Sequence, residues 1–179
     1  MTSQHRDLPE RLALTDDNRG GSPMEQLERL EPSDAIILRH YDLPAAKRTS
    51  LAKELRLASR AQGIRLLIAG DGQLAHQVKA DGLHLPRWLL KRGYDWRARI
   101  KPGFVITAAV HNEAELTAAV RSGVDAALLS PVFPTDSHPG VKPLGPIRFA
   151  ALAARSHIPI YALGGATDTS MRRLANVEK

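Results

Sequence analysis

Short apolar runs alternate with segments of helical spacing along most of the chain. About seven such runs recur, roughly 20 to 25 residues apart, and each is apolar throughout rather than at every second position. Strands that are buried on both faces of a parallel sheet have this pattern. We therefore expect parallel strands at residues 11–15, 35–39, 64–68, 82–85, 104–110, 126–129 and 158–163.

The segments between these runs predict helices. Leu51, Leu55 and Ala58 recur at helical spacing, and Gly63 follows them as a typical helix stop. Ser22 is a suitable N-cap for another, shorter helix. The expected helices cover residues 24–30, 44–62, 73–78, 113–122, 145–156 and 167–175.

This alternation leaves two α/β architectures, an open doubly wound sheet and a (β/α) TIM-type barrel. Neither GxGxxG nor GxxxxGK[ST] follows a strand, which removes the commonest nucleotide-binding argument for an open sheet. Gly164 and Gly165 follow the seventh strand directly. Phosphate sites of barrels lie on the loops after strands seven and eight, so the glycine pair favours the barrel, although a plain tight turn would also explain it.

One proline-rich loop concentrates candidate chemistry. It follows the apolar run at 126–129 and reads SPVFPTDSHPGVKPLG over residues 130–145. Because proline continues neither a sheet ladder nor a helix, the strand must end near Ser130. Ligands of α/β folds bind at the carboxyl ends of strands, so this loop is a candidate site. A long connector without a ligand is the alternative.

Composition narrows the class of protein. We expect one domain over residues 1–179, with 1–10 and 176–179 as loose ends. The chain has no cysteine, which excludes disulfides, thiolate metal sites and a cysteine nucleophile and fits a reducing compartment. No apolar run reaches the length of a membrane span, and the N-terminus lacks the apolar core of a signal peptide. We therefore expect a cytoplasmic protein without a membrane partner.

The net charge of +6 raises the question of a nucleic-acid partner. Lysine and arginine are scattered, and they are densest in residues 87–101, where Trp88, Tyr94 and Trp96 lie among them. Aromatic and basic side chains together can bind single-stranded nucleic acid. A helix and turn whose aromatic rings pack on the body while the charges face water is favoured, so nucleic acid is disfavoured as a partner.

Four segments, in this order and spacing, resemble one family. They read ADGLHLP at 80–86, AVHNEAE at 109–115, GVDAALLSPVFPT at 123–135 and IPIYALGG at 158–165. Together they resemble the thiamine phosphate synthase family, which also contains the thiazole tautomerases. The resemblance implies a (β/α)8 barrel of thiamine biosynthesis with a site for a thiazole phosphate. In true synthases it also implies a pyrimidine diphosphate held with magnesium.

The resemblance implies that several residues of the synthase site are replaced or displaced in this chain. Arg39 keeps the arginine of a Gln-Leu-Arg-Glu-Lys run, whereas Tyr41 replaces its lysine. Of the two aspartates that hold magnesium, one is displaced to Asp71 and the other, near Pro86, has no counterpart. The Thr-x-Thr-Lys loop becomes residues 135–138, TDSH. We therefore expect only trace synthase activity, unless Asp71, Lys142 or Arg87 substitutes for the missing charged groups. Magnesium is expected only if that activity is retained. No other cofactor is expected.

The tautomerase branch requires no metal, and its histidine after the fifth strand corresponds to His111. Histidine suits proton transfer because its pKa lies near neutral pH. A role in capping or supporting the next helix is the alternative for His111, and His84 is assigned a structural role. The resemblance thus implies His111 as the catalytic residue, with a small phosphorylated ligand bound by Arg39, Thr135, Ser137, His138, Gly164 and Gly165. A non-catalytic phosphate-ligand binder or assembly protein on the same fold is the alternative function.

The C-terminal end departs from the family pattern. Family members continue past the ALGG turn and its helix with another strand, whereas this sequence ends at Lys179. We therefore expect the eighth β/α unit of the barrel to be lacking or incomplete. An exposed barrel edge would favour pairing with a second copy, so a homo-oligomer is one arrangement that follows.

Overall fold

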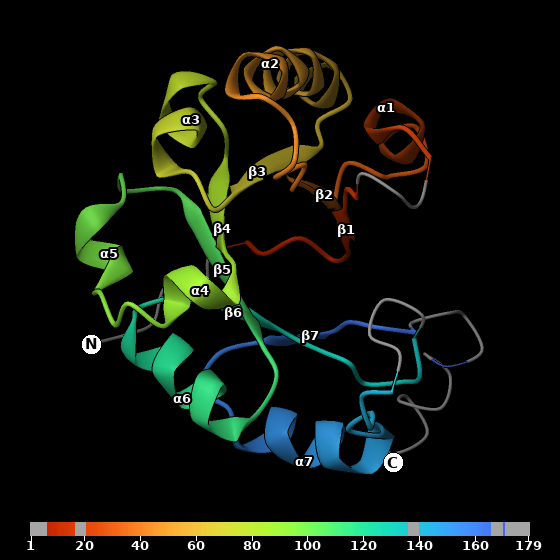
Figure 1. Cartoon of the computed structure of the whole chain (residues 1–179), viewed down its shortest axis with the longest axis vertical. Helices are drawn as coiled ribbons and strands as arrows, with labels where there is room; N and C mark the ends of the chain where they lie inside the picture. The colour runs from red at the N-terminus through yellow and green to blue at the C-terminus, as the bar shows by residue number, and fades with distance from the viewer. Residues whose placement is uncertain (1–6, 17–20, 136–139, 166–169, 171–179) are drawn as a thin grey trace. The chain divides into compact units, whose positions relative to one another are not determined.

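A computed structural model describes residues 7–16, 21–135, 140–165 and 170 (Figure 1). All strand pairs that are described run parallel and join strands that are consecutive in the chain. The strands are β1 (Leu12–Leu14), β2 (Ala35–Leu38), β3 (Arg65–Ala69), β4 (Gly82–Leu85), β5 (Val105–Val110), β6 (Ala126–Leu129) and β7 (Ile160–Ala162). These confirm the strands expected from the apolar runs, with ends that differ by at most two residues.

The helices also follow the expected pattern. The helices are α1 (Pro23–Leu27), α2 (Ala45–Ala61), α3 (Gly72–Gln77), α4 (Arg87–Leu90), α5 (Trp96–Arg99), α6 (Glu113–Arg121) and α7 (Pro146–Arg155). Ser22 caps α1 as expected, in a capping box with Glu25. Two expectations lie outside the described residues, apart from Ser170. They are the helix at 167–175 and the missing or incomplete eighth β/α unit.

The chain forms two compact units. The first contains residues 1–86 and 99–106, in which β1 to β4 follow one another in the sheet. Every residue of β2 is buried, and β3 is buried from its second residue onward. The helices α1, α2 and α3 lie on the same side of these strands (Figure 1). Burial on both faces explains why these strands are apolar throughout.

The second unit contains residues 87–98 and 107–179, in which β6 lies between β5 and β7. All four residues of β6 are buried, and α7 buries Phe149 and Leu152. The basic, aromatic segment forms α4 and part of α5 here. Trp96 is buried and its backbone N–H donates to Ser122, whereas Trp88 is 53% exposed beside Arg92.

No helix in the described ranges has the length and apolar character needed to cross a membrane.

Candidate functional site

The proline-rich loop after β6 packs onto the glycine pair after β7. The backbone N–H of Val132 donates to Leu163 O at 2.9 Å, and that of Phe133 donates to Gly164 O at 3.1 Å. Thr135 lies beside the same turn, since its Cγ2 would be 3.5 Å from a Cβ placed on Gly164. The structure therefore brings together Thr135, Gly164 and Gly165, three of the residues that the sequence singled out.

Close packing explains why both positions of the turn are glycine. Their φ angles are +84° at Gly164 and +65° at Gly165, in the left-handed region that side chains disfavour. A Cβ would lie 3.0 Å from Pro131 Cα at the first position and 2.8 Å from Phe133 Cβ at the second. In the described part of the chain, the backbone N–H groups of the two glycines donate to no acceptor. Such N–H groups are available to an anion.

His111 directly follows β5 and contacts the first residue of this loop. Its Nδ1 is 2.8 Å from the carbonyl oxygen of Ser130 and 3.4 Å from the Ser130 hydroxyl. Because a carbonyl oxygen only accepts, Nδ1 carries the proton of the neutral ring and Nε2 is its basic atom. The backbone N–H of His111 donates to Glu115 Oε2 at 3.0 Å. Asn112 is the N-cap of α6 and accepts from Glu115 N, so His111 is not the capping residue.

Two other predicted site residues, Ser137 and His138, lie outside the described residues. Arg39 is described, but it belongs to the first compact unit, whereas Thr135 and the glycine pair belong to the second. A pocket shared by Arg39 and the loop after β6 therefore stays a prediction.

In the first unit, Arg39 follows β2 directly and lies among polar side chains. Its backbone N–H donates to Thr15 Oγ1 at 3.0 Å, and its guanidinium is 3.6 Å from Asp16. Thr15 Oγ1 is also 2.8 Å from His40 Nδ1, and both of these side chains are buried. Sequence reasoning did not select Thr15 or His40 as site residues. Thr15 directly follows β1, and His40 is the second residue after β2.

His84 lies on β4 and is 3% exposed. Burial, together with the positive charge of Arg39, lowers the pKa of His84 to about 3. Its imidazole is therefore neutral at physiological pH, which fits a structural role better than that of a proton donor.

A buried arginine that the sequence did not reveal joins the ends of β2 and β3. Arg48 donates from Nη2 to Ala69 O at 2.6 Å and from Nε to Arg39 O at 3.0 Å. Its guanidinium carbon is 5.5 Å from the ring centroid of Tyr41. Partial burial raises the pKa of the Tyr41 hydroxyl. An arginine in the first turn of a helix usually points to solvent, so no sequence pattern indicated this role.

In the described ranges of the chain, the residues present do not suit a resident magnesium ion. Asp71 Oδ1 accepts the backbone N–H of Leu74 at 2.8 Å as the N-cap of α3, and its Oδ2 is 3.7 Å from Arg48 Nη1. Among the described residues, no group of three or more histidine, cysteine, aspartate or glutamate side chains could hold a metal. Arg87 is paired with Glu115 at 2.5 Å. Both Asp71 and Arg87 therefore have partners within the fold, which disfavours them as substitutes in the synthase site.

Comparison with known proteins shows which family the chain is similar to. A model of the thiamine monophosphate synthase family matches residues 15–178. The chain is 33% identical over 164 residues to the putative thiamine-phosphate synthase 2 of Aquifex aeolicus, covering 90% of this chain and 87% of that protein. The chain belongs to the thiamine monophosphate synthase family. This membership confirms the resemblance and places the chain in thiamine biosynthesis.

Further relatives agree with this membership. The thiamine-phosphate synthase of Geobacillus kaustophilus is 31% identical over 179 residues, covering 96% of this chain and 74% of that protein. A putative thiamine-phosphate synthase of Geobacter sulfurreducens is 33% identical over 137 residues, and the match spans 64% of its length. The solved thiamine phosphate pyrophosphorylase of Pyrococcus furiosus superposes with a TM-score of 0.78 at 23% identity, over 97% of this chain and 83% of that one. The fold is therefore of the TIM-type α/β class, as the sequence predicts.

Proposed function

We propose that this chain binds a thiazole phosphate at the carboxyl ends of β6 and β7 and moves a proton on it with His111. The observation that carries the proposal is the 2.8 Å contact between His111 Nδ1 and Ser130 O. It holds an imidazole at the first residue of the loop that packs onto Gly164 and Gly165. A candidate acid–base group on the segment after β5 thus contacts the loop after β6, which carries part of the candidate phosphate grip.

The phosphate grip consists of neutral donors. The backbone N–H groups of Gly164 and Gly165 and the hydroxyl of Thr135 donate to the phosphate oxygens. Backbone N–H groups after a barrel strand are well suited to an anion because they approach it without a side chain between. Ser137, His138 and Arg39 are the further groups that the family pattern assigns to the ligand.

The chemical step is a tautomerisation. His111 Nε2 takes a proton from one position of the thiazole ring and returns it to another, so the composition of the ligand does not change. The Ser130 carbonyl keeps the ring oriented and stabilises the imidazolium that forms in between. General acid–base groups of this kind contribute roughly 10² to 10⁴ in rate.

The names of the relatives raise synthase activity as a second candidate. The A. aeolicus and G. kaustophilus proteins bear the names putative thiamine-phosphate synthase 2 and thiamine-phosphate synthase. In this chain Tyr41 replaces a lysine of the family pattern, and Asp71 caps α3. These departures disfavour the coupling of a pyrimidine diphosphate, and a non-catalytic ligand binder remains the alternative on the same site.

The test measures conversion of the thiazole phosphate tautomer by NMR, with the full chain and with EDTA present throughout. We expect conversion that survives EDTA and falls at least about a hundredfold in His111→Ala. His157→Ala, which removes an exposed histidine after α7, serves as the matched control. Ligand-induced stabilisation without conversion would favour the non-catalytic alternative. Magnesium-dependent coupling of a pyrimidine diphosphate at an ordinary enzymatic rate would contradict the proposal.

A further inference from the structure

A cavity of about 920 Å³ opens at the amino ends of β3, β4 and β5, whereas the proposed active site lies at carboxyl ends of strands. All of its lining residues belong to the first compact unit. Its volume lies in the range of small-molecule sites, roughly 300 to 1,000 Å³. It is therefore large enough for a ligand that the proposed function does not include.

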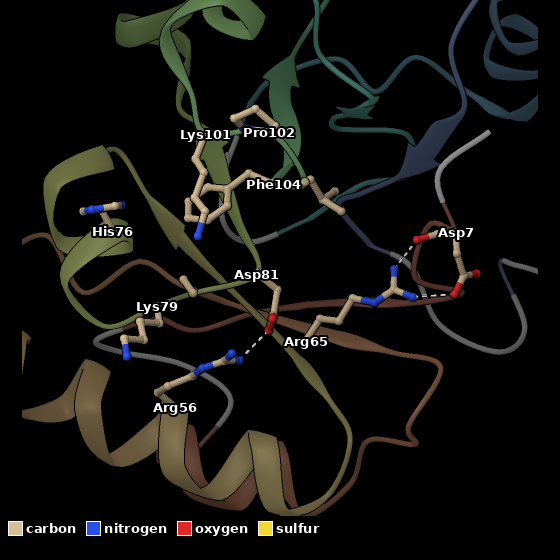
Figure 2. A pocket seen from close by; sticks show the side chains of 12 residues that line it. Asp7, Arg56, Arg65, His76, Lys79, Asp81, Lys101, Pro102 and Phe104 are labelled. Atoms are coloured by element: carbon tan, nitrogen blue, oxygen red, sulfur yellow. Dashed lines mark hydrogen bonds and ion pairs between the residues drawn. The ribbon is translucent and has the colours of Figure 1, made fainter. Parts of the chain in front are cut away.

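The lining of this cavity is basic. Four cationic side chains, Arg56, Arg65, Lys79 and Lys101, face two carboxylates, Asp7 and Asp81. Two positive charges are thus in excess before His76, which also lines the cavity, is counted. Figure 2 shows Lys101 on one side of the cavity and Arg56 and Lys79 on the other.

Ion pairs hold the two arginines in place. Arg56 Nη1 is 2.6 Å from Asp81 Oδ2, which also accepts the backbone N–H of Leu66 at 2.9 Å. Arg65 Nη2 is 2.7 Å from Asp7 Oδ2. Lys79 and Lys101, by contrast, make no ion pair within the described ranges. The two lysines are therefore the cations that a ligand can engage without displacing a carboxylate.

The backbone of Lys79 is a second, independent observation. Its φ angle is +53°, a left-handed conformation in which glycine is preferred. Lys79 N donates to His76 O and Ala80 N donates to Ala75 O, a hydrogen-bond pattern that typically ends a helix with glycine. Glycine is the preferred residue at this position of a helix end, so lysine costs some stability here and its side chain is held at the cavity by an unusual backbone conformation.

The cavity also has an apolar wall. Pro102 and Phe104 line it next to Lys101, opposite Arg56 and Lys79 in Figure 2. Two excess positive charges match a phosphate monoester, which carries roughly −1.5 to −2 near neutral pH. We propose that this cavity binds a small phosphate monoester with an aromatic ring, its phosphate held by Lys79 and Lys101 and its ring lying against the exposed Pro102, next to the 8% exposed Phe104. The proposal is independent of the proposed function, because it uses none of the residues at the carboxyl ends of the strands.

The experiment is calorimetric titration of the full chain at low salt with AMP, adenosine and inorganic phosphate as probes. We expect AMP to bind more tightly than either of the other two. Lys79→Gly and Lys101→Met should each weaken AMP binding about tenfold, because each removes one charge-assisted contact. Lys79→Arg should retain binding, and Lys53→Gln, which changes an exposed lysine of α2 outside the cavity, should leave it unchanged.

Two readouts separate this site from a folding effect and from the proposed active site. Lys79→Gly should raise the melting temperature while it weakens AMP binding, because glycine relieves the left-handed backbone. Thr135→Val should leave AMP binding unchanged. Absence of AMP binding at millimolar concentration, equal affinity in the two lysine variants and the wild type, or a loss that follows Thr135→Val would each overturn the proposal.

Discussion

His111 Nδ1 lies 2.8 Å from the carbonyl oxygen of Ser130, the first residue of the loop between β6 and α7. This hydrogen bond decides which ring nitrogen is basic, since a carbonyl oxygen cannot donate. It also couples the end of β5 to the end of β6, two strands that lie side by side. The acid–base group is therefore oriented by backbone, which tolerates changes in neighbouring side chains.

Substitution of His111 by asparagine tests the two functions of the ring separately. The amide can still donate to Ser130 O, whereas it lacks the basic nitrogen. We expect kcat for the tautomerisation to fall at least about a hundredfold while KM changes little. Steady-state kinetics with EDTA present check this. An increase in KM of similar size, with kcat unchanged, would indicate a binding role instead.

Substitution of Gly164 by alanine should destabilise the chain by about 2 to 3 kcal/mol. Part of this cost is the left-handed φ of +84°, and the rest is the contact of the new Cβ with Pro131. Gly140→Ala is the matched control, since φ is +80° there and no atom of the described residues lies within 4 Å of its Cβ position. We expect only the backbone part, roughly 1 kcal/mol, for the control. Urea denaturation measures both, and equal losses would contradict the packing argument.

The lowered pKa of His84 predicts that the folded chain loses stability in mild acid. Its pKa is lowered to about 3 in the folded chain, so below the unfolded pKa of 6.5 the unfolded chain binds the extra proton. The free energy of unfolding should therefore fall as the pH drops from 6.5 toward 3. Between pH 7 and pH 5, His84 should account for about 2 kcal/mol of this fall. Denaturation of His84→Gln over that range should show a correspondingly flatter dependence on pH.

Arg48→Met should cost about 2 to 4 kcal/mol of stability. It removes the donors to Ala69 O and Arg39 O and leaves both carbonyl groups without this partner in the interior. Arg60→Met, which changes an exposed arginine near the end of the same helix, should change stability by less than about 0.5 kcal/mol. Similar losses in the two variants would show that the buried hydrogen bonds of Arg48 contribute little.

The strands and the turn at Gly164 could be predicted from the sequence because each depends on local residues. β6 is buried on both faces and reads as four apolar residues, and the five residues after it already contain two prolines. Gly164 and Gly165 are conspicuous because glycine at a strand end often indicates a tight backbone approach. The proximity of Gly164 to Thr135 then follows from the parallel order of neighbouring strands.

The contribution of Arg48 and the basic cavity could not be predicted in the same way. Arg48 lies in the first turn of α2, and only the three-dimensional position of Ala69 O shows why the arginine is buried. Lys79 and Lys101 are 22 residues apart and look like ordinary surface lysines. Their role depends on a positive φ and on the meeting of two strand ends, which no local pattern reports.

The capping role of Asp71 has a consequence for protein engineering. A design that aims to install magnesium-dependent coupling here would gain little from Asp71, because its carboxylate already initiates α3 and lies beside Arg48. The more promising position is Gly70, which follows β3 directly and has a φ of +73°. Aspartate tolerates that backbone conformation better than most residues, so Gly70→Asp is the substitution from which such a design would begin.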